Sequence, residues 1–215
     1  MSDNKEQYHL IYFNLRGRAE SIRFILHHSG VEFRDERFEM ADWPNYKVSN
    51  ADVLPFGQVP VMKLPGGTIL SQARAIARYL ARRYNLAGAN DVEAAQMDAL
   101  ADGLEDVVIA ITPWFEAAAV AKDEAAAAVE KDKVKDKVKE NLDRFEGFLK
   151  ANNTGWLVGK HMSWIDLHMA VWMDIFQALD KQMLVSHKGL QQLTQKVHEL
   201  PSLKPYLASR PHTPF

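Results

Sequence analysis

The chain has 215 residues, of which 47% are hydrophobic and 25% are charged, and its net charge is -2. This composition is typical of a globular protein with one large domain or two smaller ones. The near-neutral charge argues against a nucleic-acid partner or an anionic membrane surface, since either would require a clustered basic face. No apolar run approaches the roughly 20 residues that a membrane-spanning helix needs.

Cysteine is absent from the sequence. No disulfide framework is therefore possible, and no protein thiol can act as a nucleophile or a redox centre. The sequence also begins without the basic and then apolar pattern of a secretory signal, so the cytosol is the expected location.

The first part of the chain alternates between strand and helix patterns. Residues 1–7 are polar and are expected to form a loose tail, and HLIYF, at 9–13, predicts the first strand. A helix follows Gly17, because apolar residues then recur at helical spacing. The elements expected next are a helix end at Ser29 and Gly30, a strand over 31–38, and an irregular segment with a short helical turn over 41–52.

The stretch 54–84, LPFGQVPVMKLPGGTILSQARAIARYLARRY, predicts a loop, a strand, a tight turn, a second strand and a helix. Residues 65–67, Pro-Gly-Gly, favour a hairpin turn. From Gln72 onwards the apolar residues fall four apart, as on one face of a helix.

Pro60 is unusual at the start of a predicted strand, because proline lacks the N–H that a central strand donates. Two interpretations fit. Either the Val59–Pro60 bond is cis, which turns the chain and leaves the Val59 backbone groups to a ligand, or Pro60 is an ordinary trans loop proline.

After a polar segment at 85–91, which we interpret as a linker, the patterns are helical. Ser163 and Asp166 form a capping box that predicts a helix start. The lysine-rich segment 123–137 indicates a solvated helix face. Two apolar stripes predict long buried helices: Met97, Leu100, Leu104, Val107 and Ile111, and then Val134, Val138, Leu142, Phe145 and Leu149.

Four segments carry a resemblance to a known family. LPFGQVPV followed by SQARAIARYL resembles the glutathione-binding half of the cytosolic glutathione transferases, and YFNLRGRAESIRF and ADWPNYK resemble the sigma class. The resemblance covers nearly the whole chain. It implies a thioredoxin-like α/β domain over 1–84, the linker at 85–91 and an all-α domain over 92–215.

Tyr12 stands at the end of the first predicted strand, on the usual ligand side of an open α/β sheet. The resemblance implies that it hydrogen-bonds the sulfur of glutathione and that Arg18 supplies a nearby cation. A free thiol has a pKa of about 8.5, so only a few per cent is nucleophilic thiolate at neutral pH. Taken alone, the two residues also fit a half-buried strand tyrosine and a surface arginine.

The resemblance assigns the other glutathione contacts in this domain to Trp43, Lys47, Gly57, Gln58, Val59, Gln72 and Ala73. Val59 offers its backbone groups as in strand addition. Ala73 begins a helix whose free N–H groups suit the γ-glutamyl carboxylate. The family motif has serine at this position, so Ala73 is a departure.

The helix after the linker has an acidic face, formed by Asp98, Asp102, Glu105 and Asp106. From periodicity alone it is a solvated face. The resemblance implies instead that it lines the interface of a homodimer, with Asp106 reaching the partner's glutathione ammonium. A divalent cation binds there in the prostaglandin-synthase branch; because Glu105 replaces an aspartate, we assign no metal.

The resemblance places Phe13, Ile111 and Trp114 in a pocket for an apolar electrophile, although Trp114 also fits a core position. We predict a homodimeric glutathione transferase that uses glutathione as co-substrate and conjugates its thiolate to apolar electrophiles. Isomerisation of a prostaglandin endoperoxide is a narrower variant. The alternative is a non-catalytic relative, either a lens-type structural protein or a carrier of apolar ligands, which Ala73 favours.

Overall fold

The computed structural model describes residues 7–213 and 215, and the chain divides into two compact units. The first unit runs to Leu86 and also includes His198–Phe215, and the second is Ala87–Val197. The tail expected over 1–7 lies outside the described residues, except for Gln7.

The first unit contains a four-stranded sheet in the order β2-β1-β3-β4. β1 (Tyr8–Phe13) runs parallel to β2 (Phe33–Phe38), and the crossover between them is α1 (Glu20–His28). β3 (Val61–Lys63) is antiparallel to both β1 and β4 (Ile69–Ser71). This is the thioredoxin-like arrangement that the sequence predicts.

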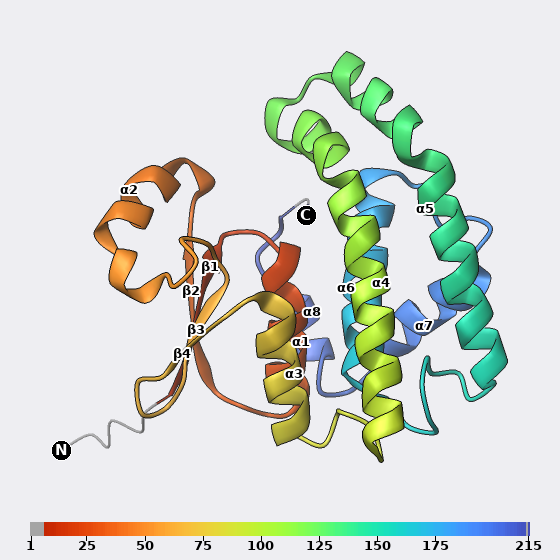
Figure 1. Ribbon diagram of the computed structural model, residues 1–215, viewed down its shortest axis with the longest axis horizontal. Helices are drawn as coiled ribbons and strands as arrows, with labels where there is room; N and C mark the ends of the chain where they lie inside the picture. Colours follow the sequence, from red (N-terminus) through yellow and green to blue (C-terminus); the bar gives the residue numbers. More distant parts are fainter. Residues whose placement is uncertain (1–6, 214) are drawn as a thin grey trace. The chain divides into compact units, whose positions relative to one another are not determined.

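α1 and α3 (Ala73–Arg83) lie together on one face of the sheet, and α2 (Trp43–Ser49) lies on the other side (Figure 1). Successive side chains along a strand point to opposite faces of the sheet, so each strand offers side chains to the helices on both faces. Ile11 and Val61 are register partners in a buried cluster that also contacts residues of α2.

The hairpin predicted between β3 and β4 is present. Gly66 and Gly67 take φ values of 88° and 86°, which residues with a side chain rarely adopt. The Val59–Pro60 bond is cis, the first of the two interpretations. The second strand starts later than expected, at Phe33, because the Val31 N–H donates to the carbonyl of Leu26 and belongs to the turn that follows α1.

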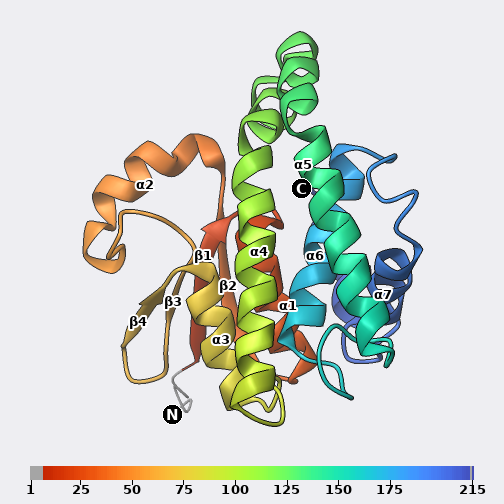
Figure 2. The ribbon, with the colours of Figure 1, turned by 45° about the vertical axis from the view of Figure 1, so that its right-hand side comes forward.

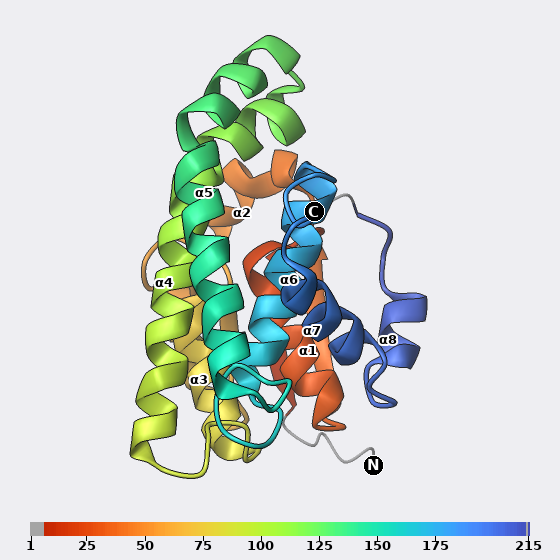
Figure 3. The same cartoon turned by 90° about the vertical axis from the view of Figure 1, so that its right-hand side faces the viewer.

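α8 (Lys204–Ser209) belongs to the first unit, whereas the sequence suggested that the whole of 92–215 formed the helical domain. α8 lies beside α1 (Figure 3), and the Tyr206 ring stacks on His27 with centroids 4.1 Å apart. Its hydroxyl donates to Glu20 of α1 at 3.0 Å, and the Arg210 guanidinium donates to the same carboxylate at 2.9 Å. These contacts join residues separated by nearly the whole chain.

The second unit is helical, and α4 lies beside α5 (Figure 2). Its helices are α4 (Asp91–Phe115), α5 (Glu124–Asn152), α6 (Trp164–Leu179) and α7 (Lys188–His198), the last of which ends at the division between the units. The predicted α4 stripe is buried throughout, and the capping box of Ser163 and Asp166 is formed. Among the described residues, no helix is both long and apolar enough to span a membrane.

Candidate functional site

The sheet register gathers the predicted site residues of the first unit at one edge. Ile11 pairs with Val61, and Val61 pairs with Ser71. Because β3 is antiparallel to its neighbours, the end of β1, the start of β3 and the end of β4 meet at this edge. Tyr12, the cis-proline turn and the start of α3 are therefore brought together there.

Tyr12 is 6% exposed at the end of β1. Its Oη accepts a hydrogen bond of 3.2 Å from the backbone N–H of Arg18. A phenol both accepts and donates. With the Arg18 N–H on an oxygen lone pair, the Tyr12 proton is directed to a different acceptor.

Burial raises the pKa of Tyr12, while the Arg18 N–H and the charges of Arg18 and Arg23 act in the opposite direction. The net shift is upward, so the phenol is protonated at neutral pH. A protonated phenol can donate a hydrogen bond to an anion and cannot remove a proton from a substrate.

Gly17 allows the loop between β1 and α1 to approach Tyr12. A Cβ atom at Gly17 would lie 2.8 Å from Tyr12 Oη and 2.5 Å from Leu15 Cδ1, and the residue has a φ of +43°. Both the contact and the left-handed backbone favour glycine. In the sequence, Gly17 marks only the start of a helix, and no pattern indicates this contact with Tyr12.

α2 forms the opposite side of the site and carries Trp43 and Lys47. The Trp43 ring packs edge-on to Phe13, with centroids 5.5 Å apart, and stacks on Phe38 at 6.0 Å. Lys47 Nζ lies 5.8 Å from the centre of the Trp43 ring, and the residue is exposed. Gly57 lies beside Lys47, since a Cβ there would be 3.1 Å from Lys47 Cε.

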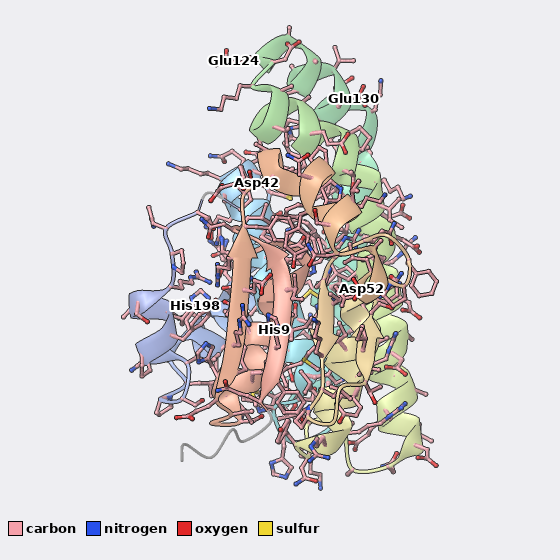
Figure 4. All side chains as sticks on the ribbon, turned by 90° about the vertical axis from the view of Figure 1, so that its left-hand side faces the viewer. His9, Asp42, Asp52, Glu124, Glu130 and His198 are labelled. Atoms are coloured by element: carbon pink, nitrogen blue, oxygen red, sulfur yellow. The ribbon has the colours of Figure 1, made fainter. Side chains whose placement is uncertain are left out.

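A hydrogen-bonded cluster joins α2 to the sheet. The Tyr46 hydroxyl donates to Glu36 of β2 at 2.7 Å, and the Tyr46 ring stacks on Phe38 at 4.1 Å. His9 Nε2 lies 2.8 Å from the same carboxylate, on the sheet face that carries α2 (Figure 4). The same view labels Asp42, which precedes α2, and Asp52, which follows it in the sequence.

The start of α3 combines an unusual backbone with an open helix end. Gln72 has a φ of 69°, which is rare for a residue with a side chain and often occurs at functional sites. In the described part of the chain no side chain caps the helix, which begins at Ala73. Its first N–H groups and its positive dipole end therefore suit a carboxylate.

The remaining predicted residues belong to the second unit. Asp106 is exposed on α4, whereas Ile111 and Trp114 are 2% and 5% exposed. Trp114 lines a cavity of about 200 Å³, and Lys131 Nζ lies 5.6 Å from its ring centre. Glu105 is 9% exposed, less than periodicity alone indicates for a solvated acidic face.

Among the described residues, no group of three or more histidine, aspartate or glutamate side chains is arranged to hold a metal ion. Exposed Gln58 and half-buried Val59 lie at the cis-proline turn, as the sequence order requires.

α1 also contains a buried ion pair that the sequence-based predictions do not include, formed by Glu20 and Arg23, which are 1% and 0% exposed. The sequence does contain a pattern that indicates this pair. An acid and a base at i and i+3 lie on a helix whose residues from 20 to 26 are otherwise largely apolar, and charges are rarely buried unless paired.

Comparison with known proteins agrees with this geometry. Residues 8–82 match the family model for the glutathione S-transferase N-terminal domain, and residues 110–210 match the model for its C-terminal domain. The chain is 34% identical over 209 residues to glutathione S-transferase 1 of Ascaris suum, covering 97% of this chain and 99% of that protein. It is 36% identical to the hematopoietic prostaglandin D synthase of Gallus gallus, covering 96% and 98%.

Solved structures of this family also superpose on the chain. A glutathione S-transferase from Ascaris lumbricoides has a TM-score of 0.85 at 34% identity, covering 97% of this chain and 100% of that one. Prostaglandin synthase D of Nilaparvata lugens has a TM-score of 0.84 at 31% identity, covering 96% and 100%. With matches to both domain models and near-complete coverage of these relatives, the chain belongs to the glutathione S-transferase family.

Proposed function

We propose that this glutathione transferase conjugates the thiolate of glutathione to small apolar electrophiles and that Tyr12 stabilises the thiolate. The observation that carries the proposal is the Tyr12 hydroxyl, which accepts the Arg18 N–H at 3.2 Å and keeps its own proton for a ligand. The residue lies at the sheet edge where open α/β folds bind ligands.

The energetic requirement is modest. Lowering a thiol pKa by about 2 units requires roughly 2.7 kcal/mol of differential stabilisation. A hydrogen bond to a charged group contributes about 1.5–3 kcal/mol, and the Arg18 cation adds to it. The thiolate then attacks the electrophilic carbon and forms a C–S bond, while the electron pair leaves with the departing group or, in an addition, takes a proton from water.

Glutathione binding follows from the same edge of the sheet. The Val59 backbone holds the cysteinyl unit as in strand addition, and Trp43 and Lys47 take the glycine carboxylate. The start of α3 takes the γ-glutamyl carboxylate through backbone N–H groups. Ala73 has no hydroxyl to donate there, so we expect binding that is weaker than in chains with serine at this position.

Further parts of the proposal rest on the resemblance. We place the chain in the sigma class and expect a homodimer, in which Asp106 reaches the partner's glutathione ammonium. Phe13, Ile111 and Trp114 are the proposed electrophile contacts. Prostaglandin isomerisation is a narrower possibility, motivated by the prostaglandin D synthases among the relatives. The cytosolic location stays a prediction.

Two measurements test the proposal together. The purified protein should be retained on immobilised glutathione and should conjugate glutathione to a halonitrobenzene, with a rate that depends on Tyr12. Retention without conjugation would support the carrier alternative. A protein that is neither retained on glutathione nor active in conjugation would show that this chain does not use glutathione.

A further inference from the structure

The loop between β1 and α1 rests on a fully buried arginine. Arg23 Nη1 donates to the carbonyl oxygen of Leu15 at 2.9 Å and lies 3.4 Å from that of Arg16. Both carbonyls belong to the segment 14–18, which ends with the N–H that donates to Tyr12. One guanidinium therefore holds the loop immediately before the amide that contacts the proposed catalytic hydroxyl.

Acids on two elements fix the orientation of Arg23. Its Nε donates to both carboxylate oxygens of Asp35 in β2, at 3.2 and 3.0 Å, and its Nη1 donates to Glu20 at 3.1 Å. The planar guanidinium suits this task, because its donors point in fixed directions that an ammonium group does not reproduce.

Glu20 is held in turn by α8. Its carboxylate accepts the Tyr206 hydroxyl and the Arg210 guanidinium, at 3.0 and 2.9 Å. A buried carboxylate requires such partners, and here they come from residues near the C-terminal end of the sequence. α8 therefore fixes the acid that orients Arg23.

Arg23 also lies close to Tyr12 itself, with its guanidinium carbon 6.0 Å from the centre of the phenol ring. Its Nη2 is buried and has no hydrogen-bond partner in the described part of the chain. An unsatisfied buried donor is unfavourable, and native structures retain few of them. The contacts with the loop and the two acids therefore set the position of Arg23, although they leave its Nη2 without a hydrogen bond.

We propose that Arg23 is a positioning residue for the conjugation reaction: it holds the loop 14–18 so that the Arg18 N–H donates to Tyr12 Oη. This inference rests on the proposed function of Tyr12. A hydroxyl that accepts a hydrogen bond is polarised and becomes a stronger donor. Through the loop, Arg23 therefore strengthens the bond from Tyr12 to the glutathione thiolate without touching glutathione.

The test uses Arg23→Lys, which keeps the charge and removes the planar donor set. The readout is the pKa of the glutathione thiol in the complex, from the ultraviolet absorbance of the thiolate. We expect this pKa to rise and kcat to fall about 5–20-fold, while the KM for glutathione changes less than about threefold. Arg144→Lys, an exposed arginine of α5, is the matched control and should change neither quantity.

A double-mutant cycle separates positioning from a general structural role. If Arg23 acts through the Tyr12 hydroxyl, Arg23→Lys should have almost no further effect on the thiol pKa in the Tyr12→Phe background. An equal shift in both backgrounds, or an unchanged thiol pKa in the folded Arg23→Lys protein, overturns the inference.

Arg23→Lys requires a check of folding by circular dichroism, because the site is buried. If that variant does not fold, Asp35→Asn replaces it, since Asp35 is partly exposed and orients Arg23 through Nε. Asp35→Asn should also raise the thiol pKa, with about a two- to fivefold loss of kcat, and no change would overturn the inference.

A wild-type protein that binds glutathione without lowering its thiol pKa would refute the proposed role of Tyr12. That failure would be visible before any Arg23 variant is made.

Discussion

The two sides of the proposed glutathione site are built differently. On the loop side, defined by residues 14–18 and α1, Tyr12 depends on a buried charged network in which Arg23 and Glu20 are 0% and 1% exposed. On the α2 side, defined by Trp43–Ser49, no residue is fully buried, and the helix is held by stacked rings and by one carboxylate.

This difference matches the two tasks of the site. Stabilising a thiolate requires a donor held close to its productive position, and a network of buried hydrogen bonds supplies that rigidity. Binding the ends of a tripeptide tolerates more movement, and elements with few buried contacts open at a lower free energy. Changes on the loop side should therefore alter kcat, and changes on the α2 side should alter affinity.

The largest effect is expected on the loop side, from Tyr12→Phe. This change keeps the ring and removes the hydroxyl, with a loss of about 1.5–3 kcal/mol in the transition state. We expect kcat to fall about 10–100-fold with little change in the KM for glutathione. A variant that instead lost affinity at unchanged kcat would place Tyr12 among the binding contacts and remove the contrast between the two sides.

Ala73→Ser tests the start of α3, which also belongs to the binding part of the site. The added hydroxyl can donate to the γ-glutamyl carboxylate, and a bond to a charged acceptor contributes about 1.5–3 kcal/mol, part of which water already supplies. Calorimetry should show glutathione binding about three- to thirtyfold tighter, at nearly constant kcat. No gain would mean that this carboxylate is held elsewhere, and the carrier alternative would gain support.

Tyr46→Phe weakens the attachment of α2 to the sheet. The variant keeps the stack on Phe38 and removes the 2.7 Å hydrogen bond to Glu36. We expect the dissociation constant for glutathione to rise about two- to fivefold, because Trp43 and Lys47 are then less well placed, while kcat is unchanged. A fall in kcat as large as that of Tyr12→Phe would show that the two sides do not act separately.

A smaller effect should follow from pH. Partial burial tends to raise the pKa of Glu36, but hydrogen bonds from Tyr46 and His9 outweigh it and hold the pKa below its usual 4.5. A carboxyl with a lowered folded pKa stabilises the fold above its unfolded pKa, and that stabilisation is lost as the pH falls through the folded pKa. The attachment of α2 should therefore loosen below about pH 4.5.

Amide hydrogen exchange across that pH range would detect the loosening in α2, after correction for the intrinsic pH dependence of exchange. Glu36→Gln supplies the control, since it removes the titrating group and should abolish the pH-dependent part. An equal effect in the Gln variant would assign the change to another group.

Local patterns in the sequence predicted much of the fold. The Pro-Gly-Gly hairpin and the capping box of Ser163 and Asp166 depend on neighbouring residues, and both are present. The place of α8 was not predictable in this way, because the Tyr206–Glu20 contact joins residues 186 apart in sequence. A helix pattern does not indicate which unit it will pack against.

For the site as well, local motifs were predictive, whereas contacts between distant elements were not. The end of β1, the turn at Pro60 and the start of α3 were indicated by motifs, and the register brings them to one sheet edge. The cis form of the Val59–Pro60 bond was one of two interpretations that the sequence left open. The positive φ of Gln72 and the support of the loop by Arg23 were not indicated, since both depend on contacts between elements. From periodicity alone Glu105 belonged to a solvated face, and the resemblance put that face at a dimer interface; in the structure Glu105 is 9% exposed within the single chain.

The most direct test of the account is the pKa of the glutathione thiol bound to the wild-type protein and to Tyr12→Phe, measured by ultraviolet titration. We predict a bound thiol pKa well below the free value of about 8.5 in the wild type, and a rise of about 1–2 units in the variant. A bound thiol pKa that is the same in both proteins would contradict the central claim that the Tyr12 hydroxyl stabilises the thiolate.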